Sequence, residues 1–226
     1  MIKWLEDAVF YEVYPQSFRD SNGDGIGDIP GITEKLEYIQ ELGCNALWIN
    51  PCFTSPFYDA GYDVEDYYSV APRYGTNEDL KKLFEAAHQR GMHVLLDLVP
   101  GHTAVTHPWF QESMKAEKNE YTHRYVWTDS LYKRMEDVKG IVSVLRGISP
   151  RPASCGVNCF STQPALNYGF ANITDAGWQQ PTDAPGPMAT REELKNIMRF
   201  WLTLGCDGFR VDMADPPVAG CAGIFE

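Results

Sequence analysis

Residues 93–99 read HVLLDLV, a run of apolar residues that only Asp97 interrupts after its first position. A continuous apolar run of this length is typical of a strand that is buried on both faces, as in a parallel sheet. Before it, apolar residues recur at helical spacing from Leu80 to Ala87, and Gly91 stands where such a helix would end. The order predicts a helix followed by a buried strand that carries a single carboxylate.

Two further strands and one helix are expected before this run. Residues 9–14 (VFYEVY) combine β-branched and aromatic side chains, and Pro15 closes them. Residues 46–49 (ALWI) read as a short buried strand. Between these strands, residues 32–42 keep the helical period and Gly43 ends it.

After the run, the alternation of strand and helix patterns stops over residues 102–187, which are polar, aromatic and rich in Pro and Gly. It resumes with a helix that we expect to begin at Thr190, in a capping box with Glu193, and to end at Leu204. A strand at 208–211 follows. Strands that alternate with helices imply a parallel sheet, and a doubly wound sheet and a (β/α)8 barrel both fit this pattern.

Composition excludes several classes of protein. With 44% hydrophobic and 13% aromatic residues, the chain has enough apolar material for a substantial core. Its formal net charge of −12, from 31 acidic and 19 basic residues, opposes contact with phosphates, so we expect no nucleic-acid partner. A neutral, hydroxyl-rich ligand such as a carbohydrate is compatible with this balance.

We also expect a cytoplasmic protein without a membrane partner. The first residues contain no secretory signal, and no apolar stretch is long enough to cross a bilayer. The six cysteines are scattered through a long chain, which favours reduced thiols. Cys155 and Cys159 are spaced as C-x3-C without a second ligand pair nearby, and a disulfide or metal there is the minor alternative.

Polar residues concentrate just after the predicted strands, at the edge where parallel α/β folds bind ligands. In GFRVD, residues 208–212, Arg210 and Asp212 lie two positions apart and therefore on one side of the strand. A fixed guanidinium favours the ionised form of a neighbouring carboxylate, which suits a nucleophile. A buried salt bridge that braces the fold explains the same pair.

Four motifs stand in order at successive strand ends: QSF with D-x-N-x-D-G-x-G-D (16–28), GYDVEDYY (61–68), D-x-V-x-x-H (97–102) and GFRVD (208–212). Together they resemble the α-amylase family of glycoside hydrolases, most nearly its oligo-1,6-glucosidase, α-glucosidase and trehalose synthase-like members. The resemblance implies an α/β fold: the first half of a (β/α)8 TIM barrel, with about four strands and an irregular small domain inserted after the third.

On this resemblance, residues 1–101 begin the catalytic barrel, 102–187 form the inserted small domain and 188–226 continue the barrel. The general acid of the family is a glutamate after a fifth strand, and Glu226 follows Asp212 too closely to be that residue. We therefore expect a truncated chain that is inactive alone.

The resemblance also assigns roles to three residues around the last strand. Asp212 resembles the catalytic nucleophile, and Arg210 resembles the arginine that orients it. Asp97 resembles the aspartate that supports this arginine. A retaining glycosidase needs an ionised carboxylate and a second carboxyl about 5 to 5.5 Å away, which acts as acid and then as base.

Tyr62, Asp63 and His102 resemble the groups that hold the sugar ring at the cleavage point. Tyr62 offers a flat face for the apolar side of a pyranose, and the two polar side chains can bond its hydroxyls. A solvated turn carboxylate is the alternative for Asp63, and a capping or packing residue is the alternative for His102.

The loop between Asp20 and Asp28 places oxygen ligands at alternate positions, with glycines that permit a sharp turn, as Ca²⁺ requires. Gly31 replaces the glutamate that an EF-hand needs. The resemblance implies a structural calcium on Asp20, Asn22, Asp24, the Ile26 carbonyl and Asp28. An Asx-rich turn without metal is the alternative.

Three positions depart from the pattern of the family. Gly101 replaces the usual Asn before His102, which removes a side-chain amide; Ala165 stands for an Asp, and Asp215 for a Lys or His. These departures leave α-1,4 against α-1,6 preference open. The sequence also leaves open hydrolysis against transglycosylation and the oligomeric state.

The sequence thus predicts a retaining glycoside hydrolase or transglycosylase that acts on α-glucosidic bonds of oligosaccharides. A glucan-binding partial barrel without catalysis and a non-functional fragment are the alternatives. A calcium-binding interaction protein would explain only one of the four motifs.

Overall fold

The computed structural model describes residues 2–135 and 141–213, which fall into two compact units. Unit 1 consists of Met1–Thr54, Asp66–Leu98 and Ile197–Arg210. Unit 2 consists of Ser55–Glu65, Val99–Asn196 and Val211–Glu226. The domain boundaries expected after residues 101 and 187 stay predictions.

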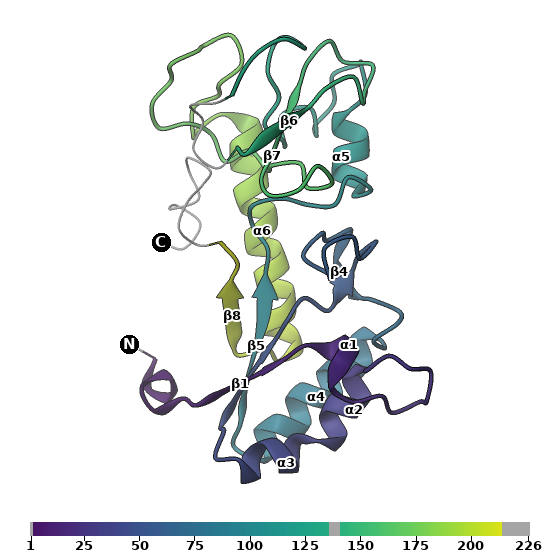
Figure 1. The fold of residues 1–226 in the computed structure, drawn as a ribbon. Helices are drawn as coiled ribbons and strands as arrows, with labels where there is room; N and C mark the ends of the chain where they lie inside the picture. The colour runs from purple at the N-terminus through teal and green to yellow at the C-terminus, as the bar shows by residue number, and fades with distance from the viewer. Residues whose placement is uncertain (1, 136–140, 214–226) are drawn as a thin grey trace. The chain divides into compact units, whose positions relative to one another are not determined.

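Unit 1 is built on a four-stranded sheet in the order β1-β2-β5-β8 (Figure 1). Its strands are β1 (Phe10–Val13), β2 (Ala46–Ile49), β5 (His93–Leu98) and β8 (Gly208–Val211). β2 pairs in parallel with β1 and with β5, so that Trp48 lies between Glu12 and Leu95. The four strands that the sequence predicts are confirmed, and together they form one sheet.

The helices α2 (Ile29–Glu34), α3 (Leu36–Glu41) and α4 (Asn77–Gln89) lie together beside this sheet (Figure 1). α4 begins at a capping box between Thr76 and Asp79, and it buries the predicted apolar face from Leu80 to Ala87. Unit 1 also contains a 3-10 helix (Lys3–Asp7), α1 (Pro15–Phe18), and the antiparallel pair β3 (Phe53–Thr54) and β4 (Asp66–Val70).

The single helix predicted at 32–42 is wrong, because the chain forms two short helices there. The Asp28 side chain accepts a hydrogen bond from Gly31 N–H and so starts α2 before residue 32. Lys35 then leaves the helical conformation, with φ −104° and ψ 8°, and its N–H bonds the carbonyls of Ile32 and Thr33. Gly43, at φ +85°, follows α3 as predicted.

Helix α6 (Pro185–Leu204) begins five residues before the predicted start, so the capping box at Thr190 is wrong. The Thr190 hydroxyl bonds the carbonyl of Gly186, four residues back, which is a contact of a helix interior. A proline suits the first helical position because its missing N–H would have no partner there. Gly205 follows the helix at φ +118°.

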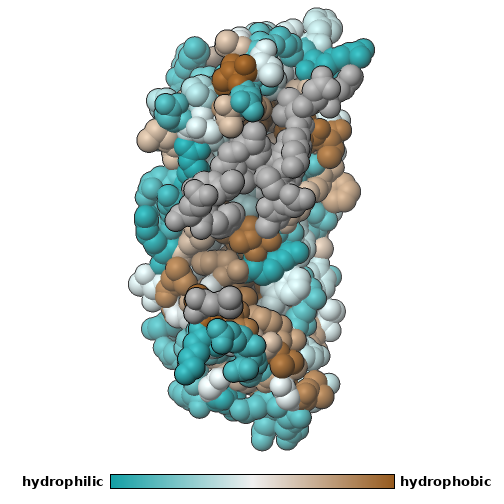
Figure 2. All heavy atoms as spheres, turned by 90° about the vertical axis from the view of Figure 1, so that its left-hand side faces the viewer, coloured by the Kyte–Doolittle hydropathy of each residue, from teal (hydrophilic) through white to brown (hydrophobic). Residues whose placement is uncertain are grey.

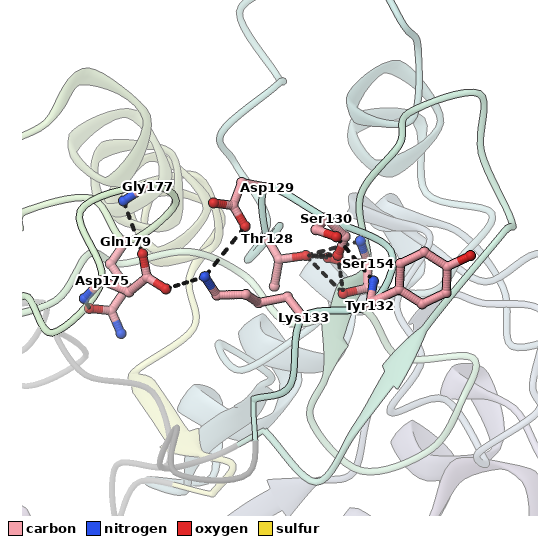
Figure 3. Close-up of polar contacts among 9 residues, drawn as sticks. All are labelled: Thr128, Asp129, Ser130, Tyr132, Lys133, Ser154, Asp175, Gly177 and Gln179. Carbon is pink, nitrogen blue, oxygen red and sulfur yellow. Dashed lines mark hydrogen bonds and ion pairs between the residues drawn. The ribbon is translucent and has the colours of Figure 1, made fainter.

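Unit 2 has little regular structure, as the end of alternating strand and helix patterns after β5 predicts. It contains α5 (Pro108–Ser113) and an antiparallel pair, β6 (Ser143–Leu145) and β7 (Cys155–Val157). Polar side chains fix its loops: Lys133 pairs with Asp129 and Asp175, and the Thr128 hydroxyl contacts Ser154 (Figure 3). A cluster of apolar residues forms its core: Val126, Met135, Ala165 and Phe170.

The surface mixes apolar and polar side chains on the face that Figure 2 displays. Exposed apolar residues include four of the N-terminal segment: Ile2, Leu5, Val9 and Phe10. Within the described residues, we find no helix long and apolar enough to span a membrane. The cysteines there are free thiols, and Cys221 lies outside the described residues.

Candidate functional site

In unit 1, three neighbouring strands place Asp97, Arg210 and Trp48 in contact at their C-terminal ends. The Arg210 Nη1 atom lies 3.1 Å from both oxygens of Asp97. Trp48 Nε1 donates a hydrogen bond of 3.0 Å to Asp97 Oδ2, and the Arg210 guanidinium carbon lies 4.7 Å from the centre of the Trp48 ring. The Asp97 side chain has no exposed surface, so its charge is balanced inside the protein.

This cluster brings together Asp97 and Arg210, the pair that the sequence predicts. The sequence reading missed Trp48, which it treated only as an apolar strand residue in ALWI. A partly buried tryptophan usually bonds its indole N–H to a partner, and for Trp48 the carboxylate of the next strand is that partner. Trp48 thus fixes one oxygen of Asp97 and supports the guanidinium from one face.

In unit 2, His102 stands next to Tyr62 and within electrostatic reach of Asp212. His102 is 2% exposed, and its Nε2–H donates to the Tyr62 carbonyl at 3.1 Å. Burial lowers the pKa of His102, whereas the charge of Asp212 and the hydrogen bond to Tyr62 act to raise it. Unit 2 therefore brings two of the predicted residues, Tyr62 and Asp212, to the buried imidazole of a third, His102.

Asp212 follows β8 directly and is half-buried. Burial raises the pKa of the neighbouring Cys159 thiol, and the charges of Asp212 and Asp59 raise it further. Cys159 Sγ lies 3.3 Å from Met213 Sδ, and Met213 has an unusual positive φ of 49°. The predicted nucleophile thus lies at a turn just beyond the strand end, among side chains of unit 2.

Asp63 is fully buried and is used to fold its own loop. Its Oδ1 accepts hydrogen bonds from Ser55 Oγ at 2.9 Å and from Asp59 N–H at 3.1 Å. Its Oδ2 accepts one from Tyr58 N–H at 2.8 Å. These bonds stabilise a turn that holds Ala60 at φ +54°. A direct role of Asp63 in sugar binding stays a prediction, and the geometry gives it this structural task.

Asp59 is a candidate that the sequence reading passed over as one of several turn carboxylates. Its side chain is partly exposed, and its Oδ2 accepts a hydrogen bond of 2.7 Å from Gln163 Nε2. Its charge also acts to raise the pKa of His102. No pattern in the sequence separates Asp59 from Asp63, because only the folded loop decides which carboxylate turns inward.

The loop from Asp20 to Asp28 is a series of turns closed by side chains. Asp20 accepts hydrogen bonds from the N–H groups of Gly25 and Gly23, which lower the pKa of its carboxyl group. Asn22 Oδ1 and Asp24 Oδ1 each accept the N–H two residues on. The turns thus hold oxygen atoms of all the predicted ligands within one short loop.

The chemistry of this donor set suits calcium, because it offers carboxylate, amide and carbonyl oxygens. Among the described residues, no three His, Cys, Asp or Glu side chains stand ready together as metal ligands. A calcium ion here would therefore draw on Asn22 and the Ile26 carbonyl as well as on the aspartates. The calcium site stays a prediction.

Gly27 of this loop and Gly31 of α2 pack against α1 and the residue after it. A Cβ on Gly27 would lie 2.1 Å from the carbonyl oxygen of Pro15, and one on Gly31 would lie 2.1 Å from that of Arg19. Both distances are far shorter than any contact that a carbon atom tolerates. The backbone itself is thus the packing surface at these two positions.

Comparison with known proteins gives a family match over residues 12–217, to the alpha amylase catalytic domain. The oligo-1,6-glucosidase of Bacillus sp. (strain F5) is 38% identical over 213 residues, which are 94% of this chain and 39% of that protein. The trehalose synthase/amylase TreS of Mycolicibacterium smegmatis is 42% identical over 215 residues, which are 92% of this chain and 33% of that protein.

Solved structures agree with this match. The trehalulose synthase MutB from Pseudomonas mesoacidophila MX-45 has a TM-score of 0.78 and 38% identity, over 93% of this chain and 35% of its own. The alpha-glucosyl transfer enzyme XgtA has a TM-score of 0.76 and 38% identity, over 92% of this chain and 36% of its own. The chain thus spans about a third to two fifths of the length of these relatives.

The fold, the order of the strand-end motifs and these matches point to one family. The described sheet is the four-stranded part of a (β/α)8 barrel, with unit 2 contributed largely by the long segment between β5 and α6. The chain belongs to the alpha-amylase family and contains part of its catalytic domain.

Proposed function

We propose that the protein is a retaining glycoside hydrolase or transglycosylase that acts on α-glucosidic bonds of oligosaccharides. Arg210 precedes Asp212 by two residues. The observation that carries the proposal is the contact of Arg210 with both oxygens of the buried Asp97. The names of its relatives support the bond type, since they include oligo-1,6-glucosidases, α-glucosidases and trehalose synthases.

In this proposal, Asp212 is the nucleophile and Arg210 orients it. Asp97 and Trp48 fix the guanidinium, so its positive charge is preorganised at the end of β8. A guanidinium fixed in that position can orient the carboxylate of Asp212, two residues further along the chain. Asp212 would attack the anomeric carbon while the glycosidic oxygen leaves with a proton from a second carboxyl group.

The second carboxyl group is not assigned to any described residue. We therefore propose that the 226-residue chain alone binds sugar but does not cleave it, and that turnover belongs to a longer form with the general acid. Tyr62 and His102 are the proposed sugar-binding groups. Among the loop carboxylates, partly exposed Asp59 is better placed for a hydroxyl than fully buried Asp63.

We also propose a calcium ion on the loop between Asp20 and Asp28, where it would bind oxygens of Asp20, Asn22, Asp24, Ile26 and Asp28. Bound calcium would stabilise the loop and take no part in bond cleavage. The cytoplasmic location remains a proposal, which the free thiols of the described cysteines support.

The test compares the 226-residue chain with the longest form that its source encodes, on maltose, isomaltose and sucrose. In the longer form, Asp212→Asn should lower kcat by a factor on the order of 10⁴, as loss of a covalent nucleophile does. Asp129→Asn, at an exposed ion pair with Lys133, is the matched control and should leave kcat near the wild-type value. Near-normal turnover of Asp212→Asn would show that the nucleophile assignment is wrong.

Calorimetric titration of the 226-residue chain with maltose tests whether this chain alone binds sugar. Binding without release of reducing sugar is the result expected if this chain binds the sugar and only a longer form supplies the general acid. Sugar release by this chain alone would contradict it, because the general acid would then lie within the 226 residues. A chain with no cooperative thermal transition would support the reading as a non-functional fragment.

A further inference from the structure

A cavity of about 180 Å³ lies within unit 2, and none of the proposed catalytic or sugar-binding residues is among the described residues that line it. One group of lining residues is His123, Trp127, Thr128 and Arg151, and the other is residues 176–180. Lys133 links these groups, because its ammonium group pairs with Asp129 and with Asp175 (Figure 3). One water molecule takes up about 30 Å³ in the liquid, so the cavity has room for a larger polar ligand.

The guanidinium of Arg151 is held in a fixed position at this cavity. Its Nη1 atom donates to the carbonyls of Ser113 at 2.8 Å and Thr122 at 2.9 Å, and its Cζ atom lies 4.4 Å from the centre of the Trp127 ring. Arg151 is half-buried, yet it forms no ion pair with any residue that the structure describes. Its Nε and Nη2 atoms likewise have no hydrogen-bond acceptor among these residues. A fixed, half-buried cation without a counter-ion favours the binding of an anion.

Two glutamine side chains in the lining have their oxygen atoms already bonded within the protein. Gln179 Oε1 accepts hydrogen bonds from Thr174 N–H at 2.7 Å and from Asp175 N–H at 2.9 Å. Gln180 Oε1 accepts one from Asn167 Nδ2 at 3.1 Å. Each amide therefore keeps its NH₂ group as a donor, while its acceptor is used.

The other lining side chains also lack an unused oxygen. The Thr128 hydroxyl bonds Ser154 Oγ at 2.8 Å (Figure 3). Trp178 adds a buried N–H, because its Nε1 atom has no hydrogen-bond partner among the described residues. The bond to Lys133 is the main reason that the pKa of the neighbouring Asp175 carboxyl group is lowered, and Trp178 contributes less. The side chains of the lining thus offer N–H donors and no spare oxygen acceptor.

Positive charge is concentrated around His123, whose side chain is exposed. Partial burial lowers the pKa of His123, and the charges of Arg151 and Lys118 lower it further. A neighbouring cavity of about 230 Å³ shares His123 and Arg151 with the first, and three more charged residues line it: Lys115, Lys118 and Asp129. Lys115 pairs with Glu112, and Asp129 pairs with Lys133. Arg151 and Lys118 are thus left as cations without a counter-ion among the described residues.

We propose that this cavity binds a tetrahedral oxyanion, a phosphate or sulfate group, through Arg151 and the amide NH₂ groups of Gln179 and Gln180. An oxyanion carries acceptors only and therefore matches a lining of donors and positive charge. A neutral sugar matches it less well, because each hydroxyl group also needs an acceptor for its own proton. The proposal is independent of the proposed function, since it assigns no role to Asp212.

Nuclear magnetic resonance of the 226-residue chain with ¹⁵N-labelled histidine tests the site, with sulfate as the probe because its charge is constant near neutral pH. The chain has five histidines, and His123→Asn identifies the signals of His123. Sulfate should shift these signals in a saturable manner and move the titration of His123 to higher pH, because a bound anion favours the protonated imidazole. A wild type without a saturable shift would overturn the proposal.

Gln180→Glu is the decisive variant, because it keeps the oxygen that accepts from Asn167 and replaces the NH₂ donor by a charged oxygen. It should weaken sulfate binding at least about tenfold. Gln16→Glu, at an exposed position of unit 1, adds the same charge and should leave the affinity unchanged. Equal affinity of the wild type and Gln180→Glu would contradict the site.

Arg151→Gln removes the central cation and should also weaken sulfate binding at least about tenfold. It also loses the bonds to two carbonyl groups, so its thermal unfolding is measured alongside. Gln180→Glu decides the matter if Arg151→Gln does not fold. Undiminished sulfate binding by a folded Arg151→Gln would overturn the proposal.

Calorimetric titrations with inorganic phosphate, glucose 6-phosphate and glucose identify the source of the oxyanion. Tighter binding of glucose 6-phosphate than of inorganic phosphate indicates a site for a phosphate monoester, and the reverse order indicates a site for the free ion. Either phosphate should bind more weakly to Gln180→Glu. Glucose that binds as tightly as glucose 6-phosphate would contradict recognition of an anion.

Discussion

A single carboxylate, Asp97, organises the end of the sheet in unit 1. Its side chain is fully buried and meets one guanidinium and one indole N–H. Burying a carboxylate is costly unless charge and hydrogen bonds compensate it, and here the guanidinium and the indole N–H come from the two neighbouring strands. The cluster therefore depends on the correct register of three strands, and it fixes the Arg210 guanidinium as a consequence.

Substitution Asp97→Ala should lower the free energy of unfolding by about 3 kcal/mol, because it removes the buried carboxylate that balances the charge of the partly buried Arg210. Chemical denaturation of the 226-residue chain measures this loss. Glu85→Gln, which removes an exposed pair with Lys81, is the control and should cost less than about 0.5 kcal/mol. Equal losses of stability in the two variants would contradict the prediction that the buried cluster stabilises the fold more than an exposed ion pair does.

At the scale of elements, the N-terminus of α4 combines two reciprocal hydrogen bonds. Thr76 Oγ1 accepts from Asp79 N–H at 3.2 Å, and Asp79 Oδ2 accepts from Thr76 N–H at 3.0 Å. Thr76→Ala should destabilise the chain by about 1 kcal/mol. The control is Thr203→Ala, at an exposed position of α6. It removes a side-chain bond to the Arg199 carbonyl and should change the free energy of unfolding by less than about 0.5 kcal/mol. Thermal unfolding of both variants checks the difference.

Asp207 links α4, β5 and the start of β8. Its carboxylate bonds His88 Nε2 at 2.8 Å, His93 Nδ1 at 3.0 Å and Val94 N–H at 2.8 Å. Burial acts to raise the pKa of Asp207, but the hydrogen bonds outweigh it and the net pKa lies below the ordinary 3.8. A lowered pKa in the folded state means that the charged form stabilises the fold.

The stability that Asp207 contributes is therefore complete above about pH 4 and is lost as the pH falls through its lower folded pKa. Urea denaturation of the wild type and Asp207→Asn as a function of pH measures it. The difference between the two should be constant near neutral pH and shrink in acid. A difference that grows as the pH falls would contradict the assignment.

Patterns predict the elements that depend on local order. The strands at 46–49 and 208–211 follow from short apolar runs, and their bounds agree with the sequence reading. The prediction of one helix at 32–42 is wrong, because the break at Lys35 depends on how Asp28 caps the start of α2. The predicted start of α6 is wrong, because the capping sequence at Thr190 lies inside a longer helix.

The partners of the site could not be predicted in the same way. Trp48 acts through its hydrogen bond to Asp97, which lies 49 positions away in the chain, so no local pattern marks it. Asp59 and Asp63 lie in one loop, four positions apart, and only the fold of that loop shows which carboxylate is buried. The sequence predicts which strand ends matter, and tertiary contacts decide which side chains support them.

At the scale of the whole molecule, we expect calcium to raise the melting temperature. Removal of the ion by a chelator should lower Tm, and added calcium should restore it, because a ligand that binds only the folded state stabilises that state. Magnesium is the control, since it prefers a tighter octahedral shell. An identical Tm with chelator and with calcium would leave the loop as an Asx turn without metal.

The close approach of Gly27 and Gly31 to neighbouring carbonyls has a consequence for a library that carries every amino acid at each position from Asp20 to Gly31. Selection for folded protein should remove all other residues at these two positions, whatever the calcium concentration, because a Cβ there would overlap backbone oxygen. Asp20, Asn22 and Asp24 should instead tolerate replacement more widely once calcium is withheld from every variant. The tolerance profile of this short segment would thus separate residues kept for the chain's own geometry from residues kept for a metal.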